Sequence, residues 1–253
     1  MNPFGMTRSV IVPNDHALIA PDSHVPTPLP GWTGAKGTVL IAPVGGMASA
    51  RFTQYLASLE AGATVGPPPK GIERVFYVLS GTVEVQVPSG DPKTLTTGGF
   101  AFVPADVAVP TRAAEASELL IFEKRYTPLA DTAPHQFVVG QEQDVPAKPF
   151  LGDDAARLTT LLPETLPFDL AVNIFTYDPG ATLPFVETHV MEHGLLMIAG
   201  AGIYRLGEKW YPVGTGDAIW MASYCPQWFA ATGKNPARYI YYKDVNRDPL
   251  EAL

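Results

Sequence analysis

The sequence predicts an all-β protein built from two similar sandwich-like or barrel-like units in tandem. Short runs rich in Val, Ile, Phe, Tyr and Thr are separated throughout by turn residues, since the 253-residue chain contains 26 Pro and 23 Gly. Segments of the first half also recur, in the same order, in the second half. Helical patterns are scarce, and proline interrupts the run over residues 158–166 that could form a turn of helix.

The recurrence covers four pairs of segments at an offset of about 120 residues, which indicates duplication of one structural unit. Gly81 and Gly200 hold the same place in the two copies, and glycine there is typical of a tight turn beside a strand. The paired segments are EAGAT (60–64) with DPGAT (178–182), 72–87 with 191–206, TTGGFAFVPA (96–105) with GTGDAIWMAS (214–223), and 119–129 with 239–250.

These observations predict four parts of the chain. We expect an N-terminal arm over residues 1–30, a first unit over 31–125, a proline-rich linker over 126–149 and a second unit over 150–253.

Charge and composition narrow the function classes. The formal net charge is -8, and the chain lacks the clustered Lys and Arg that neutralise phosphates, which argues against a nucleic-acid partner. No run approaches the roughly 20 apolar residues of a membrane helix, and the first residues lack the apolar stretch of a signal peptide. The single cysteine, Cys225, excludes an intrachain disulfide. We expect a cytoplasmic protein that acts on a small molecule.

Metal-ligating residue types gather in the second copy, in E-T-H-V-M-E-H (187–193). Glu187, His189 and His193 are separated by even numbers of residues, so an extended chain places them on one face, with Glu192 pointing elsewhere. A helix would also align the two histidines, but the glutamate is misplaced for the helical H-E-x-x-H zinc motif and the flanks predict turns and strands. The alternative is an ordinary pair of surface or core histidines.

This segment resembles the cupin signature, in which a Gly is followed by His-x-His, a Glu and a second Gly. Gly180 and Gly200 hold the glycine places. Glu187 stands at the first His place, His189 at the second, and His193 at the Glu place.

A second cupin motif places a fourth ligand eleven residues after the Gly of a Gly-Asp pair, which leads from Gly216 and Asp217 to Gln227. Ala222 and Tyr224 replace the Pro and Gly usually found between them, so this motif is degenerate.

The exchanged ligands and several further segments make the chain similar to the (S)-ureidoglycine aminohydrolase family, formerly described as glyoxylate-induced proteins. The similarity extends from about Gly31 onward. Its motifs are GIERVFYVLSG (71–81), FEKRYTPL (122–129), ETHVMEHG (187–194) and YKDVNRDP (242–249).

The resemblance implies a bicupin, with two jelly-roll units, that hydrolyses (S)-ureidoglycine to (S)-ureidoglycolate and ammonia in purine catabolism through allantoin and allantoate. It implies a Mn²⁺ cofactor, and by analogy a homo-oligomer. Carboxylate, imidazole and amide ligands suit a six-coordinate divalent ion such as Mn²⁺ or Fe²⁺ better than a structural zinc. The implied metal ligands are Glu187, His189, His193 and Gln227.

The resemblance also implies roles around the metal. Tyr204, Tyr239 and Lys243 resemble family residues that face the substrate. Glu187, as ligand or proton shuttle, and Lys243, which lies in the intact YKDVNR motif, are the candidate catalytic residues.

The equivalent places in the first copy hold residues that cannot form this ligand set, so we expect the N-terminal unit to be metal-free and structural. Glu73 and Arg74 are interpreted as a structural ion pair rather than a vestigial site. The residues at the four ligand places are Pro68, Lys70, Arg74 and Pro110.

Other interpretations remain open. Another cupin enzyme, such as a dioxygenase or an isomerase, is one alternative, although the usual set of three His and one Glu is absent. A non-enzymatic small-molecule-binding cupin is another. Individually, Lys243 could be a solvated charge, Tyr204 and Tyr239 packing residues, and Gln227 a core-edge amide. Cys225 is interpreted as a small buried hydrophobe, because no histidine is near it in sequence.

Overall fold

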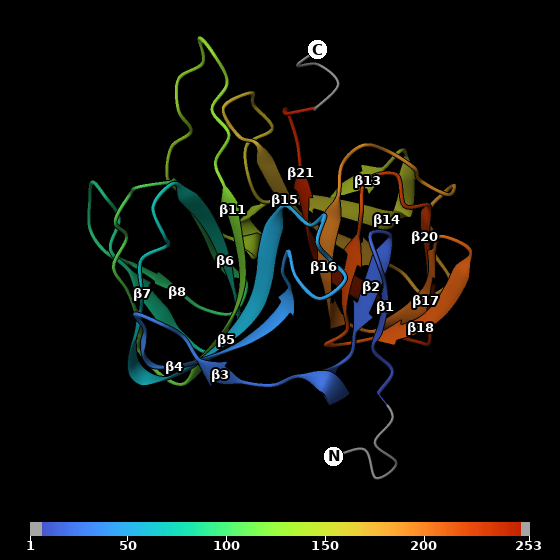
Figure 1. Ribbon diagram of the computed structural model, residues 1–253, viewed down its shortest axis with the longest axis horizontal. Coiled ribbons are helices and arrows are strands. Elements are labelled where there is room, and N and C mark those ends of the chain that lie inside the picture. Colours follow the sequence, from blue (N-terminus) through green and yellow to red (C-terminus); the bar gives the residue numbers. More distant parts are fainter. Residues whose placement is uncertain (1–6, 249–253) are drawn as a thin grey trace.

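The computed structural model describes residues 7–248 and shows two strand-rich units side by side (Figure 1). The predicted all-β class is confirmed, because the helices among the described residues are two short 3-10 segments, Pro21–Ser23 and Glu142–Asp144. Part of the predicted arm (1–6) and the end of the second unit (249–253), with Pro249 of the last motif, lie outside the described residues.

The first unit is a ten-stranded sheet in the order β12-β9-β6-β11-β5-β10-β7-β8, with β4 paired to β5 and β3 to β4. The long β5 curls this sheet, because its first part pairs with β11 and its last residues pair with β10. The strands are β3 (Thr27–Pro28), β4 (Thr33–Ile41), β5 (Phe52–Val65), β6 (Ile72–Ser80), β7 (Val83–Val85), β8 (Lys93–Leu95), β9 (Gly99–Val103), β10 (Thr111–Ala113), β11 (Ser117–Arg125) and β12 (Val138–Gln141).

The second unit combines an eight-stranded sheet, ordered β1-β2-β19-β16-β21-β15-β14-β13, with a three-stranded sheet, β18-β17-β20. The strands of the large sheet are β1 (Val10–Val12), β2 (His16–Ile19), β13 (Lys148–Phe150), β14 (Asp153–Thr160), β15 (Leu170–Tyr177), β16 (His193–Ala199), β19 (Ala218–Met221) and β21 (Ala237–Asp244). Those of the small sheet are β17 (Ala201–Leu206), β18 (Lys209–Gly214) and β20 (Gln227–Thr232).

The predicted arm and linker take part in these sheets. The β1–β2 hairpin of the arm pairs with β19 of the second unit, with His16 opposite Met221, and its blue strands lie among orange ones in Figure 1. In the linker, β12 pairs with β9 of the first unit and β13 with β14 of the second. The domain boundaries themselves stay a prediction.

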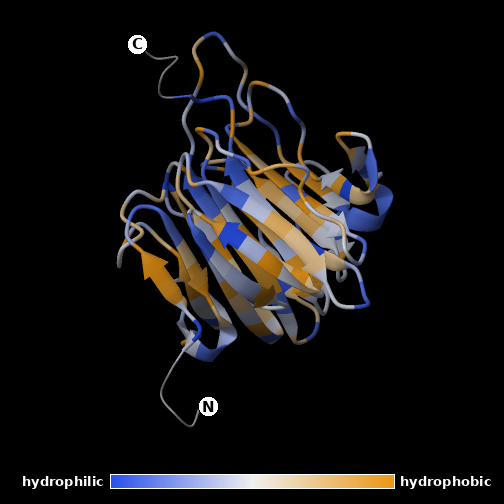
Figure 2. Cartoon of the chain, turned by 90° about the vertical axis from the view of Figure 1, so that its right-hand side faces the viewer, coloured by the Kyte–Doolittle hydropathy of each residue, from blue (hydrophilic) through white to orange (hydrophobic). Residues whose placement is uncertain are grey.

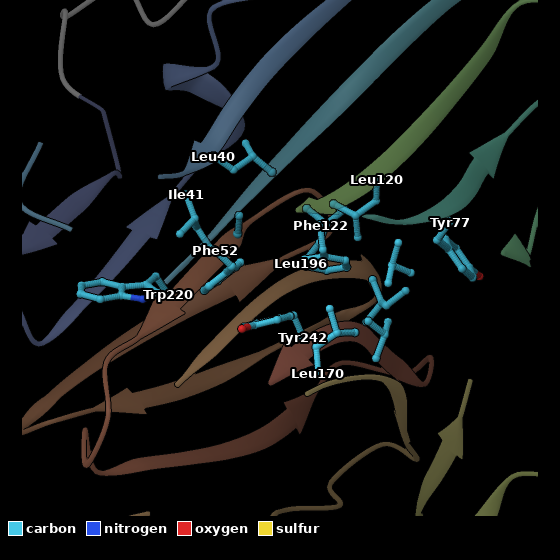
Figure 3. Packing of buried hydrophobic residues seen from close by; sticks show 14 of the residues in the cluster. Leu40, Ile41, Phe52, Tyr77, Leu120, Phe122, Leu170, Leu196, Trp220 and Tyr242 are labelled. Carbon is cyan, nitrogen blue, oxygen red and sulfur yellow. The ribbon is translucent and has the colours of Figure 1, made fainter. Parts of the chain in front are cut away.

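Three apolar clusters organise the core. One fills the first unit, one fills the second, and a third, shown in Figure 3, joins the two. The joining cluster includes Phe52 and Phe122 from the first unit and Trp220 and Tyr242 from the second. Strands β9 and β19 are buried along their whole length, because one face meets the interior of its own unit and the other meets the neighbouring unit.

Outer strands are buried on one face only. Buried and more exposed residues alternate along β17 and β18, and hydrophobic and hydrophilic residues are interleaved along the strands in Figure 2. This period of two is expected for strands with one solvated face. None of the described helices is long and apolar enough to cross a membrane.

The glycines predicted at matching turns have matching conformations. Gly81 and Gly200 have φ of 80° and 72°, in the left-handed region that favours glycine. A Cβ on either residue would collide with a backbone carbonyl, that of Ala116 or Pro236 respectively. The two copies therefore turn the chain after β6 and β16 in the same way.

Candidate metal centre and active site

The four predicted ligands come from three neighbouring pieces of the second unit. Glu187 pairs through its backbone with Gln227, the first residue of β20, at N–O distances of 2.8 and 2.9 Å. His193 is the first residue of β16. His189 lies in the loop between them, where its carbonyl accepts a hydrogen bond from Tyr224 N at 2.7 Å. The sequence predicted one continuous strand through these residues. The structure instead has an isolated β-bridge at Glu187, a loop that contains His189, and a strand that begins at His193.

The two imidazoles and the amide nevertheless meet. His189 Nε2 lies 3.1 Å from His193 Nε2 and 3.1 Å from the Gln227 side-chain amide. The opposite ring nitrogens face backbone carbonyls: His189 Nδ1 is 3.1 Å from Met191 O, and His193 Nδ1 is 3.4 Å from Tyr242 O. A carbonyl only accepts, so Nδ1 carries the proton of each neutral ring and the Nε2 lone pairs point toward one another.

Burial sets the charge of this group. It lowers the pKa of His193 well below its usual value and lowers that of His189, so both rings stay neutral, the form that binds metal ions. Burial also raises the pKa of the Glu187 carboxyl, while the nearby charge of Lys243 opposes that rise. Lys243 lies on β21 directly opposite His193, so its side chain emerges on the same face.

The geometry fits a divalent cation. Two ligand atoms at right angles and about 2.1 Å from one ion lie about 3 Å apart, as the two Nε2 atoms do. A cation between them would also relieve the repulsion of facing lone pairs, and the Gln227 amide could turn its oxygen to the same point. The Glu187 carboxylate lies farther away, since it does not join the imidazoles in a set of ligand atoms within 4.8 Å. It would have to rotate inward to become a ligand.

A cavity of about 20 Å³ adjoins His193 and Gln227, enough for one water molecule. Tyr204 and Tyr239 form part of its wall, and the Tyr239 hydroxyl lies 3.1 Å from that of Tyr177. Sequence reasoning missed Tyr241, although the alternation Tyr239, Tyr241, Lys243 along one strand was a signal for a shared face. The cavity is lined by Phe175, His193, Leu195, Tyr204, Met221, Gln227, Tyr239 and Tyr241.

Comparison with known proteins shows which family the chain belongs to. The cupin domain family matches residues 173–242, and the EutQ-like cupin domain family matches residues 47–126. The probable (S)-ureidoglycine aminohydrolase of Oryza sativa subsp. japonica is 45% identical over 246 residues, which cover 97% of this chain and 78% of that protein. The chain belongs to the (S)-ureidoglycine aminohydrolase family. The predicted bicupin fold and family resemblance are thus confirmed.

A further relative and a solved structure support this conclusion. The (S)-ureidoglycine aminohydrolase of Escherichia coli (strain K12) is 34% identical over 246 residues, with 95% of this chain and 92% of that protein covered. The crystal structure of the putative glyoxylate induced protein from Pseudomonas aeruginosa superposes with a TM-score of 0.87 at 28% identity, covering 96% and 92% of the two chains.

The first unit of this family member uses Arg74 structurally. At the place where the second unit has His193, Arg74 donates to Glu123 at 2.6 and 2.8 Å and to the Gly66 carbonyl at 2.6 Å. The interpretation of Glu73 and Arg74 as an ion pair with each other is wrong. Arg74 pairs with Glu123 and Glu73 with His135, because adjacent residues of β6 point to opposite faces. Glu73 turns instead toward the other unit.

A second group of ligand-type side chains, which we call the junction cluster, consists of Glu73, His135, Asp169 and Lys124. One atom each of Glu73, His135 and Asp169 lies within 4.8 Å of the others, all buried, so by type and spacing the group could hold a metal ion. His135 Nε2 is 2.6 Å from Glu73 Oε2, and the Lys124 ammonium pairs with Asp169 Oδ2. Glu73 Oε1 and Asp169 Oδ1 have no hydrogen-bond partner.

The charges in the junction cluster favour a proton over a metal ion. Two carboxylates and one ammonium leave one negative charge, which a single proton between the two unpartnered oxygens would neutralise. A divalent cation would leave a net positive charge in a buried site beside Lys124. Burial, with the Asp169 carboxyl as a hydrogen-bonding neighbour, raises the pKa of Glu73 to about 7.

Cys225 has a histidine neighbour that the sequence did not reveal. The β1–β2 hairpin brings His16 and Asp15 within 4.8 Å of its sulfur. The ring nitrogens of His16 already contact Asp15 at 2.6 Å and Tyr211 at 2.8 Å, and burial raises the pKa of the Cys225 thiol to about 12. A buried thiol of this kind is not a nucleophile.

Proposed function

We propose that this chain hydrolyses (S)-ureidoglycine to (S)-ureidoglycolate and ammonia, a step of purine catabolism. Full-length relatives of 34–45% identity carry this activity in their names. The observation that carries the proposal is the pair of neutral imidazoles, His189 and His193, whose Nε2 atoms converge beside Gln227 and Glu187. We further propose a cytoplasmic homo-oligomer, on family resemblance alone.

The ligands we propose are His189, His193, Gln227 and, after an inward rotation, Glu187. The metal we propose is Mn²⁺, which when bound supplies positive charge that orients the substrate and stabilises charge developing at its α-carbon. The Lys243 ammonium is suited to pair with the substrate carboxylate, because an acidic protein needs a local positive charge to attract an anion. Tyr204 and Tyr239 offer hydroxyls at the cavity wall that can bind the polar groups of the substrate.

The reaction breaks the bond from the α-carbon to the amine nitrogen and forms one to a water oxygen. The hydroxyl part of the water stays on the α-carbon, and its proton leaves with the ammonia. Glu187 is the group we assign to moving that proton, because it supplies the carboxylate of the proposed site; in the metal-free protein burial raises the pKa of that carboxyl.

The test is ammonia release from freshly generated (S)-ureidoglycine by chelator-treated protein, with and without added Mn²⁺. We expect release that depends on Mn²⁺. Oxygen uptake would instead indicate a dioxygenase, and binding without turnover a small-molecule-binding cupin. No release at saturating Mn²⁺ would overturn the proposal.

A further inference from the structure

A charged network reaches from the first unit to the back of the proposed site. Arg51, the residue before β5, donates from its backbone N and its Nε to Glu192 Oε1, at 2.9 and 3.2 Å. Its Nη2 lies 2.7 Å from Asp244 Oδ2 and 3.3 Å from Ser223 Oγ. One guanidinium thus holds three separate segments of the second unit.

The two carboxylates in this network are the sequence neighbours of site residues. Glu192 precedes His193, and Asp244 follows Lys243. Their own contact is close, since Glu192 N donates to Asp244 Oδ1 at 2.7 Å, and Trp220 Nε1 donates to Glu192 Oε2 at 3.3 Å. Glu192 is 1% exposed and Asp244 7%, so their carboxyl oxygens depend on donors from the protein, Arg51 above all, rather than on water.

The alternation of side chains couples the two faces of these strands. Glu192, as predicted from its parity, points away from the imidazoles, toward the first unit. His193 and Lys243 point to the opposite face, and the two are register partners on β16 and β21. A shift of Glu192 or Asp244 toward solvent would therefore move the backbone that carries His193 and Lys243.

The first unit also holds the start of β16 directly. Gln54 Nε2 donates to the Leu195 carbonyl at 3.0 Å. Gly194 packs so closely on Phe52 that a Cβ would collide with its ring. Phe52 also stacks on Tyr242 of the second unit, with ring centroids 4.1 Å apart, and both are labelled in Figure 3. The backbone after His193 therefore has little freedom once Arg51 fixes the residue before it.

We propose that Arg51 is a positioning residue, through which the first unit sets the placement of His193 and Lys243 in the second. The proposal rests on the function proposed above, and it gives the unit that lacks the ligand set a part in the chemistry of the other. Arginine is required because its planar fork spans Glu192, Asp244 and Ser223 at once, which the single ammonium of a lysine cannot do. Loss of groups that orient metal ligands typically weakens metal binding or activity by roughly 10–100-fold.

The test compares Arg51→Met and Arg51→Lys with Glu142→Gln. The control residue joins the units at the other end of β21, where Glu142 pairs with Arg238 and accepts the Tyr77 hydroxyl at 2.5 Å. Titration of chelator-treated protein gives the Kd for Mn²⁺, steady-state ammonia release gives kcat and KM, and thermal unfolding of the metal-free chain gives Tm. We expect Arg51→Met to weaken Mn²⁺ binding and lower kcat by about 10–100-fold, with Arg51→Lys intermediate. Glu142→Gln should lower Tm and leave Kd and kcat at wild-type values.

Wild-type Kd, kcat and KM in Arg51→Met, with a loss of Tm like that of the control, would overturn the proposal and leave Arg51 a merely structural contact. If Arg51→Met does not fold, Arg51→Lys decides, because wild-type Kd and kcat there would equally contradict the need for a guanidinium. Failure of the proposed function would be seen separately, as wild-type protein that releases no ammonia. The Kd values for Mn²⁺ of wild-type protein and the Arg51 variants would still test the role of Arg51 in that case.

Discussion

Two adjacent imidazoles with facing lone pairs are stable only when something positive lies between them or when the surrounding chain holds them there. In this chain the Nδ1 atoms of His189 and His193 are held by the carbonyls of Met191 and Tyr242. Both rings are thereby oriented before any ion arrives, so binding need not order them. Glu187 differs from them, because no side-chain hydrogen bond fixes it among the described contacts. That freedom suits a group that moves a proton.

The first prediction concerns Glu187. Glu187→Gln keeps the shape of the side chain but removes its basicity and charge, so ammonia release should fall at least about 100-fold. Thermal unfolding should change little, since the Glu187 backbone pair with Gln227 is retained. Glu208→Gln is the matched control, because that carboxylate is 90% exposed. Near-normal turnover by Glu187→Gln would remove Glu187 from the chemistry.

The second prediction separates substrate binding from packing at Tyr204. Tyr204→Phe removes one hydroxyl at the cavity wall, and a lost hydrogen bond of about 0.5–1.5 kcal/mol should raise KM roughly 2–10-fold. Tyr55→Phe, in the core of the first unit, should leave KM unchanged. Equal KM values for Tyr204→Phe and wild-type protein, measured by initial rates of ammonia release, would mean that Tyr204 only packs.

At the scale of the strands, β21 serves both sides of the molecule. Tyr239 and Tyr241 lie in the cluster inside the second unit, whereas Ile240 and Tyr242 lie in the cluster between the units. A strand buried on both faces has no polar face, so the composition of RYIYYK predicts a strand, while the side that faces the site was indicated only by the family resemblance of Tyr239 and Lys243. The polar residue Lys243 appears only where the strand leaves the core.

The third prediction tests the duplicated turn after β6 and β16, at Gly200 in the second copy. Gly200 has φ of 72°, and a Cβ there would lie 2.5 Å from the Pro236 carbonyl oxygen. Gly200→Ala should therefore lower the free energy of unfolding by about 1–3 kcal/mol. Gly214→Ala is the control, because Gly214 ends β18 and a Cβ there would meet its nearest neighbour at an ordinary 3.8 Å. Urea unfolding measures both, and equal stabilities would contradict the strain.

The even spacing of His189 and His193 predicted that their side chains share a face, and their Nε2 atoms lie 3.1 Å apart. Gln227, whose amide lies 3.1 Å from His189, was identified only through the resemblance to the second cupin motif, eleven residues after Gly216. Contacts between distant segments were missed, because their pairing depends on the return path of the chain. Arg51 and Glu192 are 141 residues apart, and no local pattern marks either as the partner of the other. The pairing of the β1–β2 hairpin with β19 of the second unit was also not predicted, because these segments are about 200 residues apart.

At the scale of the whole molecule, the two units are joined by an apolar cluster and by buried charges. Lys124 with Asp169 and Glu73 with His135 bring charged groups from the first unit, the linker and the second unit to one place. The junction cluster takes up one proton to become neutral, so the stability of the contact between the units should depend on pH. Such sensitivity is a property of the joined molecule, since neither unit contains the whole cluster.

The fourth prediction is that pH controls stability through Glu73. Burial raises the pKa of Glu73 to about 7 from its usual 4.5, so the folded protein holds a proton that the unfolded chain releases near pH 4.5. The contribution of this proton to the free energy of unfolding is complete below pH 4.5 and is lost as the pH rises through about 7. It amounts to at most about 3 kcal/mol for a shift of this size. Glu73→Gln replaces the protonated carboxyl with an uncharged amide, which can donate to Asp169 and accept from His135.

Thermal unfolding between pH 5 and 8 tests this directly. Wild-type protein should lose more stability over that range than Glu73→Gln, and the variant should be the more stable of the two at pH 8. The same series with Glu142→Gln shows the effect of neutralising a carboxylate elsewhere between the units. Parallel pH profiles for wild-type and Glu73→Gln would refute the shared proton. A chelator-induced fall in Tm that disappears in Glu73→Gln would instead indicate a metal ion in the junction cluster, because the proposed Mn²⁺ ligands are intact in that variant.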